Sequence, residues 1–237
     1  MKLIALDTAC AACSAAVWAD GTIAASRTAA MKRGHAEALL PMILDVMGAS
    51  SVAFASLDMV AVTLGPGSFT GLRTGLATAK GIALAHDLPI VGVTSLEAVA
   101  LAAQSVAPRD VRKLPLTVVL ETRRGGVYLQ NFAADRTPLD DPCSATLEEA
   151  MTKLPKNGAV LAGDAASRIV SAMGLRVKDQ KIALMETVTG PDARYVAEIA
   201  AGRWVDGGAP VAAGSLAPLY VQAPEAKRPI AGGRLRS

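Results

Sequence analysis

LGPGSFTGLRTG, residues 64–75, decides the fold, because it joins an apolar segment at Met59–Thr63 to a long helix rich in alanine and glycine. Gly65-Pro66-Gly67 has proline at the second turn position and glycine at the third, as a type II turn requires. The helix that follows has unpaired backbone N–H groups at its start, and such groups attract anions. The stretch is either an anion site or a tight strand-to-helix turn without a ligand.

The spacing of the glycines excludes the common phosphate-binding motifs. A P-loop requires Lys and then Ser or Thr directly after its last glycine, but Leu72-Arg73 follow Gly71. A dinucleotide fingerprint requires G-x-G-x-x-G, and here one more residue separates the last two glycines. Any nucleotide bound at this loop would therefore be held by a different arrangement.

The predicted helix at 71–86 has a face without large side chains. Gly71, Gly75, Ala79 and Ala83 recur every fourth residue, so they line one side of the helix. Glycine inside a helix costs about 1 kcal/mol relative to alanine, so two glycines indicate a compensating close contact. The sheet of this chain or the helix of a partner would supply that contact. We favour a partner, because the predicted helix at 35–47 is apolar nearly all round.

Composition limits the class of protein. The 237 residues are enough for one large domain or two small ones. The net charge of +3, from 24 basic and 21 acidic residues, argues against a protein that coats nucleic acid. Three cysteines fit a reducing compartment, and no stretch has the length of a signal peptide core or a membrane span. We expect a soluble, cytoplasmic protein.

The order of predicted elements indicates an α/β protein with two related halves. Asp20-Gly21 between two apolar runs is a hairpin signal, so the chain opens with a three-stranded meander. A polar stretch at 105–113 separates the halves, and the meander then restarts. Strands are expected at 2–7, 13–18, 22–28, 59–63, 90–93, 116–121, 127–133 and 159–162, and helices at 35–47, 71–86, 95–105, 146–153, 164–173 and 192–205.

Residues for catalysis are scarce. The two histidines, His35 and His86, form no His-x-x-x-His pair, and Cys10-x-x-Cys13 has no second cysteine pair, so no zinc site is predicted. Asp7-Thr8 ends the first strand, where an acid either holds a metal–phosphate complex or caps the loop. The candidate anion or nucleotide loop comprises Asp7, Thr8, Gly65, Gly67 and Ser68.

Several strings together resemble the TsaB family. They are IALDTA at 4–9, HAEALLP at 35–41, PIVGVTSL at 89–96 and, above all, GPGSFTGLR at 65–73. In the second half the resemblance rests on Glu121-Thr122-Arg123, Val127-Tyr128 and Pro218-Leu219-Tyr220. It is dense over the first hundred residues and thin beyond them. Glu121, where the family more often has Asp, and the long tail rich in Pro and Gly are departures.

The resemblance implies an actin-like (ASKHA) fold of two ribonuclease-H-like subdomains, each a mixed sheet flanked by helices. We place the N-terminal subdomain at 1–106 and the smaller C-terminal one at 107–237, with a basic tail from about 223. The implied role is in making threonylcarbamoyladenosine next to the tRNA anticodon. In that pathway a TsaB-type chain pairs through helices with the catalytic subunit TsaD, and the ATPase TsaE joins the pair.

The resemblance also implies that this chain is not the transferase. TsaD has His-Met-Glu-Gly-His after the equivalent strand, and the matching positions here are Ser95-Leu96-Glu97-Ala98-Val99. Both metal-binding histidines are thus replaced, and Val99 cannot ligate a metal. Actin-like ATPases have a glycine-rich first turn, whereas Ala9, Ala11 and Ala12 stand here. We therefore expect weak or no ATP binding by the chain alone, and no cofactor or metal.

Two hypotheses follow. In the first, the chain is a non-catalytic scaffold that binds TsaD, forms a homodimer when alone, and reaches tRNA only through the complex. Its predicted partner interface comprises Leu39, Met42, Ile43, Val46, Gly71, Arg73, Gly75 and Ala79. In the second, the chain is an actin-like ATPase or small-molecule phosphotransferase, with Asp7 on the metal and the loop 65–71 on the phosphate. We favour the first, because the first turn lacks glycine.

Overall fold

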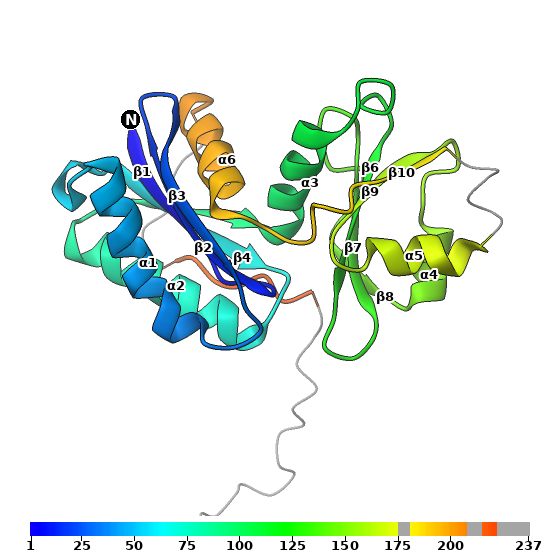
Figure 1. Cartoon of the computed structure of the whole chain (residues 1–237), viewed down its shortest axis with the longest axis horizontal. Helices are drawn as coiled ribbons and strands as arrows, with labels where there is room; N and C mark the ends of the chain where they lie inside the picture. The colour runs from blue at the N-terminus through cyan, green and yellow to red at the C-terminus, as the bar shows by residue number, and fades with distance from the viewer. Residues whose placement is uncertain (175–180, 208–214, 222–237) are drawn as a thin grey trace, which may run out of the picture.

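The first sheet contains the strands that lead into the glycine-rich loop. The computed structural model describes residues 1–174, 181–207 and 215–221. Five strands pair in the order β3-β2-β1-β4-β5 (Figure 1). β1 is antiparallel to β2 and parallel to β4, and β4 is parallel to β5. The bounds are β1 Lys2–Asp7, β2 Ala12–Ala19, β3 Thr22–Ala30, β4 Met59–Gly65 and β5 Ile90–Thr94.

The second sheet repeats this arrangement. Its order, β10-β9-β6-β7-β8, has the same pattern, with β6 antiparallel to β7 and parallel to β9. The repeat confirms the prediction of two related halves, each built on a mixed sheet. The bounds are β6 Leu116–Glu121, β7 Val127–Phe132, β8 Cys143–Ala145, β9 Ala159–Ala162 and β10 Ile182–Leu184. The short strands β8 and β10 were not predicted.

Local sequence explains the ends of several elements. Asp20 and Gly21 between β2 and β3 both have positive φ, as the two-residue hairpin turn requires. Thr94 and Glu97 form a capping box at the start of α3 (Ser95–Val106). Pro41 lies inside α1 (His35–Ser50), which continues through it as one helix. Among the described residues, no helix is both long enough and apolar enough to cross a membrane.

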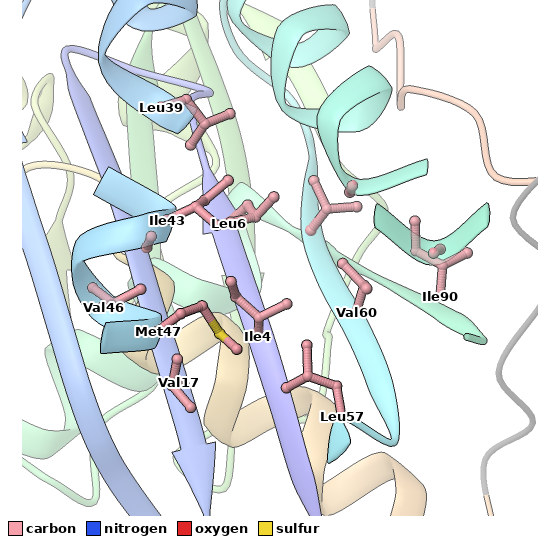
Figure 2. Packing of buried hydrophobic residues seen from close by; sticks show 14 of the residues in the cluster. Ile4, Leu6, Val17, Leu39, Ile43, Val46, Met47, Leu57, Val60 and Ile90 are labelled. Atoms are coloured by element: carbon pink, nitrogen blue, oxygen red, sulfur yellow. The ribbon is translucent and has the colours of Figure 1, made fainter. Parts of the chain in front are cut away.

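Helices α1 and α2 (Phe69–Ala85) cover one face of the first sheet. Alternate residues of β1, Ile4 and Leu6, point toward that face and pack with Ile43 and Val46 of α1 and with Val60 of β4 (Figure 2). The cluster is apolar and takes its buried residues mainly from both helices and from β1, β2, β4 and β5. This core holds the two helices in place beside the glycine-rich loop.

Helices α3 and α6 (Ala193–Val205) lie between the two sheets (Figure 1). α6 comes from the second half of the sequence, but Val196 and Ala200 pack against Leu3 and Ala61 of the first sheet. α3 comes from the first half, and Val99 packs against Val118 of the second sheet. The remaining helices, α4 (Leu147–Thr152) and α5 (Ala166–Met173), lie on the outer face of the second sheet.

α3 packs against the second sheet and α6 against the first, so the expected subdomain bounds do not fully separate the two sheets. The predicted boundary near residue 106 lies where the chain passes from α3 to β6. Because α6 returns to the first sheet, the described residues after 107 pack against both sheets rather than against one. The segment 215–221 returns as well, since the Leu219 amide donates to the Leu64 carbonyl at 2.8 Å. The predicted tail from about 223 lies outside the described residues.

The packing of α1 predicts a contrast between two neighbouring positions. Ile43 is fully buried and Leu40 is 56% exposed. Ile43→Ala should lower the free energy of unfolding by about 2–5 kcal/mol, because it leaves a cavity in the core. Leu40→Ala should change it by no more than about 0.5 kcal/mol. Urea unfolding at constant m-value measures both, and equal losses would contradict the assigned orientation of α1.

Candidate functional site

The glycine-rich loop lies at the carboxyl edge of the first sheet. β1 and β4 are parallel neighbours, so Asp7 at the end of β1 and Gly65 at the end of β4 meet at the same edge. The loop 66–68 therefore lies next to the turn 8–11 that follows β1. The Gly65–Pro66 peptide bond is cis, and Gly65 has a φ of +106°, a conformation that favours glycine. The positive φ is at Gly65 and not at Gly67, so the type II turn expected at 65–67 is not formed.

The loop and the start of α2 pack directly on that turn. A Cβ atom at Gly67 would collide with the Ala9 carbonyl oxygen, and one at Gly71 with the Thr8 carbonyl oxygen. A Cβ atom at Gly75 would collide with the Thr8 hydroxyl. The compensating contact predicted for the glycines of this helix is therefore made inside the chain. The expectation that a partner's helix makes that contact is corrected.

Hydrogen bonds join the same groups. The Ser68 amide donates to the Ala9 carbonyl at 2.7 Å, and the Thr8 hydroxyl donates to the Gly71 carbonyl at 2.7 Å. The Ser68 hydroxyl caps α2 by accepting from the Gly71 amide at 3.4 Å. The structure thus brings the predicted loop residues Thr8, Gly67 and Ser68 together. Each of these hydrogen bonds joins two groups of this chain, taken from the loop, the start of α2 and the turn 8–11.

Asp7 lies beneath the turn and is fully buried. Its Oδ1 accepts from the Thr63 hydroxyl at 2.6 Å and from the Ala9 amide at 3.1 Å. Its Oδ2 is buried without a hydrogen-bond partner among the described residues. Desolvation, opposed by the Thr63 hydrogen bond, raises the pKa of this carboxyl from 3.8 to about 7. Asp7 therefore faces the interior rather than an open phosphate site.

A hollow of about 550 Å³ opens between the loop, the turn and the second sheet. Its walls include three arginines, Arg73, Arg123 and Arg124, and the carboxylates of Glu121 and Asp164. Arg123 reaches across the hollow and donates to the Ser68 hydroxyl at 3.0 Å. This hydrogen bond ties the turn between β6 and β7 to the glycine-rich loop.

Other contacts shape the rim of the hollow. Arg168 forms an ion pair with Glu121 at 2.5 Å. The guanidinium of Arg73 lies over the Phe69 ring at 3.8 Å, and Tyr220 stacks on the same ring. Neither Arg123 nor Tyr220 was among the residues predicted to form a site. The only signal for them was their place in the strings that resemble the TsaB family.

Most of the predicted interface residues lie in the core. Leu39, Ile43, Val46 and Ala79 are buried against the first sheet, so they do not form the surface of these helices. Gly71 and Gly75 are covered by Thr8, as described above. Of the eight residues, only Arg73 is exposed, and Met42 is partly buried.

Different apolar residues form the outer surface of the two helices. On α1, Leu40 and Leu44 are 56% and 57% exposed. They are four residues apart, so they lie on one face of the helix. On α2, Phe69 is 50% exposed and Leu84 is 81% exposed. The sequence contained this signal, because α1 has apolar residues on its outer side as well as its inner side.

The two positions that match TsaD's histidines are interior. Ser95 and Val99 are both fully buried, and Val99 packs in the core that joins α3 to the second sheet. The Ser95 hydroxyl has no hydrogen-bond partner among the described residues. Within the same residues, no three His, Cys, Asp or Glu side chains lie close enough together to hold a metal ion.

The close packing of α2 on the turn predicts opposite effects for two glycines of this helix. Gly75→Ala places a methyl group against the Thr8 hydroxyl and should destabilise the protein by about 1–3 kcal/mol. Gly81 has no atom within 4 Å of an added Cβ. Gly81→Ala should therefore stabilise the protein by about 1 kcal/mol through helix propensity. Chemical denaturation measures both, and a stabilising Gly75→Ala would contradict the packing.

Comparisons with known proteins agree with this architecture. A family model described as "TsaD: tRNA N6-adenosine threonylcarbamoyltransferase" matches residues 22–188. Two solved structures of Pseudomonas aeruginosa proteins are similar over nearly the whole chain. One is titled "YeaZ" and the other is described as similar to peptidase YeaZ. Their TM-scores are 0.78, at 26% and 25% identity, and they cover 92% and 93% of this chain and 99% of their own. These structures share the expected fold of two subdomains, each a mixed sheet flanked by helices.

Curated relatives carry the name "tRNA threonylcarbamoyladenosine biosynthesis protein TsaB". The Escherichia coli protein is 38% identical over 138 residues, which are 57% of this chain and 56% of that protein. The match therefore spans little more than half of that relative. The Buchnera aphidicola protein is 29% identical over 187 residues, 76% of this chain and 86% of that protein. The chain therefore belongs to the family described as TsaD, tRNA N6-adenosine threonylcarbamoyltransferase, and within it to the TsaB family.

Proposed function

We propose that this chain is a non-catalytic subunit of the machinery that makes threonylcarbamoyladenosine in tRNA. It acts in the cytoplasm, binds a TsaD-type catalytic subunit and, with it, a TsaE-type ATPase, and reaches tRNA only through that complex. Alone, it forms a homodimer through the same helices. The names of its curated relatives support the pathway.

The packing of the glycine-rich loop is the main support for a non-catalytic role. The Ser68 amide and the Thr8 hydroxyl, which would face a phosphate group, are bonded inside the chain. The alternative role as an ATPase or phosphotransferase needs Asp7 to reach a metal–phosphate complex. Asp7 is fully buried and bonded to Thr63. The chemistry of phosphate transfer is therefore better assigned to another subunit.

The positions that match TsaD's metal ligands support the same assignment. Ser95 offers one buried hydroxyl, and Val99 offers no donor atom. Val99 instead packs α3 against the second sheet. The residues that a transferase would use for metal binding thus serve packing in this chain.

The observation that supports a partner is the apolar outer surface of α1 and α2. Leu40 and Leu44 are more than half exposed on one face of α1, next to α2 on the same side of the first sheet (Figure 1). Exposed apolar residues that gather on one surface are typical of protein interfaces. This surface, with Arg73 and Phe69 at its end, replaces the buried residues first predicted for the interface.

Charge placed on this surface should prevent association. The double variant Leu40→Glu, Leu44→Glu should bind a TsaD-type subunit about 100-fold more weakly or not at all, because a helix interface depends on a few apolar anchors. Leu139→Glu is the control, since Leu139 is 59% exposed on the second half of the molecule. Calorimetric titration measures both affinities, and sizing with light scattering measures the homodimer.

Unchanged affinity of the double variant, with unfolding like that of the original chain, would refute this interface. Equal losses in the double variant and in the Leu139 control would show that added charge weakens association regardless of position. A partner that fails to bind even the original chain would refute the scaffold role itself.

A further inference from the structure

A buried polar cluster lies where α6 returns to the first sheet. It consists of Asp7, Ser14, Thr63 and Asp192, and none of them is more than 9% exposed. Asp7 and Ser14 are directly opposite each other in the β1–β2 pair, so their side chains lie on the same face. The Ala193 amide, in the first turn of α6, donates to the Ser14 hydroxyl at 2.9 Å. The start of α6 is thus seated beside Asp7.

Besides desolvation, charge repulsion from the other carboxylate of this cluster, Asp192, raises the pKa of Asp7. Asp192 caps α6, and both of its oxygens accept from Arg194 at 3.0 Å. The Thr28 hydroxyl donates to Asp192 Oδ2 at 2.9 Å. Although burial opposes them, these hydrogen bonds lower the pKa of Asp192, so it is ionised at neutral pH.

Other groups around Asp7 do not neutralise it. Thr63 of β4 donates one hydrogen bond, and the thiol of Cys10 lies in the turn, with Asp164 of the second half beyond it. Burial raises the pKa of the Cys10 thiol and of the Cys13 thiol in β2, so both stay uncharged. Arg194 forms an ion pair with Asp192 at 3.0 Å. An ionised Asp7 would therefore experience the charge of an ionised Asp192, and the Oδ2 atom of Asp7 is buried with no hydrogen-bond partner in the described part of the chain.

We propose that Asp7 is a proton-linked latch: as a neutral acid it lets the first turn of α6 sit on the first sheet, and its ionisation loosens that turn by repulsion from Asp192. α6 packs on the first sheet and against Ala98 of α3, and α3 packs on the second sheet, so a looser first turn of α6 weakens the join between the two halves. Desolvation, with a smaller contribution from Asp192, places the pKa of Asp7 at about 7. The latch therefore operates around neutral pH.

The sign of the pH dependence follows from linkage. The pKa of Asp7 is about 7 in the folded chain, above its ordinary value of 3.8. Between these values the folded state binds more protons than the unfolded state, so stability falls as pH rises from about 4 to 7 and is then constant. Asparagine at position 7 carries no charge and should abolish this dependence.

The titration of Asp7 tests the proposal directly. Carbon-13 NMR of the aspartate side chains from pH 4 to 9 should show one carboxyl, absent in Asp7→Asn, with a midpoint near 7. Hydrogen exchange at the amides of 193–196, corrected for intrinsic rates, should lose about tenfold protection between pH 6 and 8, the change for one pKa unit. Asp7→Asn should lose none, and Asp45→Asn, on the exposed side of α1, should behave like the original chain.

A second variant separates the latch from a purely structural role of Asp7. Asp192→Asn keeps a residue that caps helices well but removes the neighbouring charge. Asp192→Asn should lower the pH midpoint of the Asp7 titration and reduce the loss of hydrogen-exchange protection at the amides of 193–196. A midpoint below 5 in the original chain would overturn the proposal even if Asp7→Asn failed to fold. Identical pH profiles for the original chain and Asp192→Asn would also overturn it.

Discussion

The rest of the structure depends on one close approach, in which the backbone of the loop and of α2 touches the backbone of the turn after β1. Three glycines make it possible, because any side chain at Gly67, Gly71 or Gly75 would occupy the space of Thr8 or Ala9. This contact holds the start of α2 at the carboxyl end of the first sheet, while the rest of the helix covers one face of that sheet. It also fixes α1, which packs with α2 in the same apolar core.

This contact has a chemical consequence. A glycine-rich loop at the end of a strand is typical of phosphate sites, because its amides point to an open space. Here the turn of the same chain fills that space, and the Ser68 amide bonds to Ala9. The loop has the sequence features of a phosphate site, but the Ser68 amide and the Thr8 hydroxyl form hydrogen bonds within the chain. On this account, the surface of α1 and α2 is what the protein offers to a partner.

Much of the fold was predictable from the sequence, and the reasons are local. Hydrophobic periodicity and turn residues predicted thirteen of the helices and strands, such as β9 and α3, to within one or two residues at each end. β8 and β10 were missed because three residues are too short for a periodic pattern. The exchange of α3 and α6 was also missed, because an amphipathic pattern shows which side of a helix is buried but not which sheet buries it.

The candidate site was predicted less well. Spacing of the glycines at every fourth residue indicated a close contact, but not that Thr8 makes it. α1 is apolar on both sides, so the sequence could not distinguish the buried Ile43 from the exposed Leu40. Arg123 and Ser68 are 55 residues apart in the chain, and only the fold brings them into hydrogen-bonding distance.

The most direct test of the central claim is a reconstitution of tRNA modification in which one protein is omitted at a time. The purified chain is mixed with TsaD- and TsaE-type subunits, tRNA, ATP and threonylcarbamoyl-adenylate, and modified adenosine is measured by mass spectrometry. The account predicts that modification stops when this chain is omitted, and that the chain alone neither modifies tRNA nor hydrolyses ATP. Full modification without the chain, or ATP turnover by the chain alone, would contradict it.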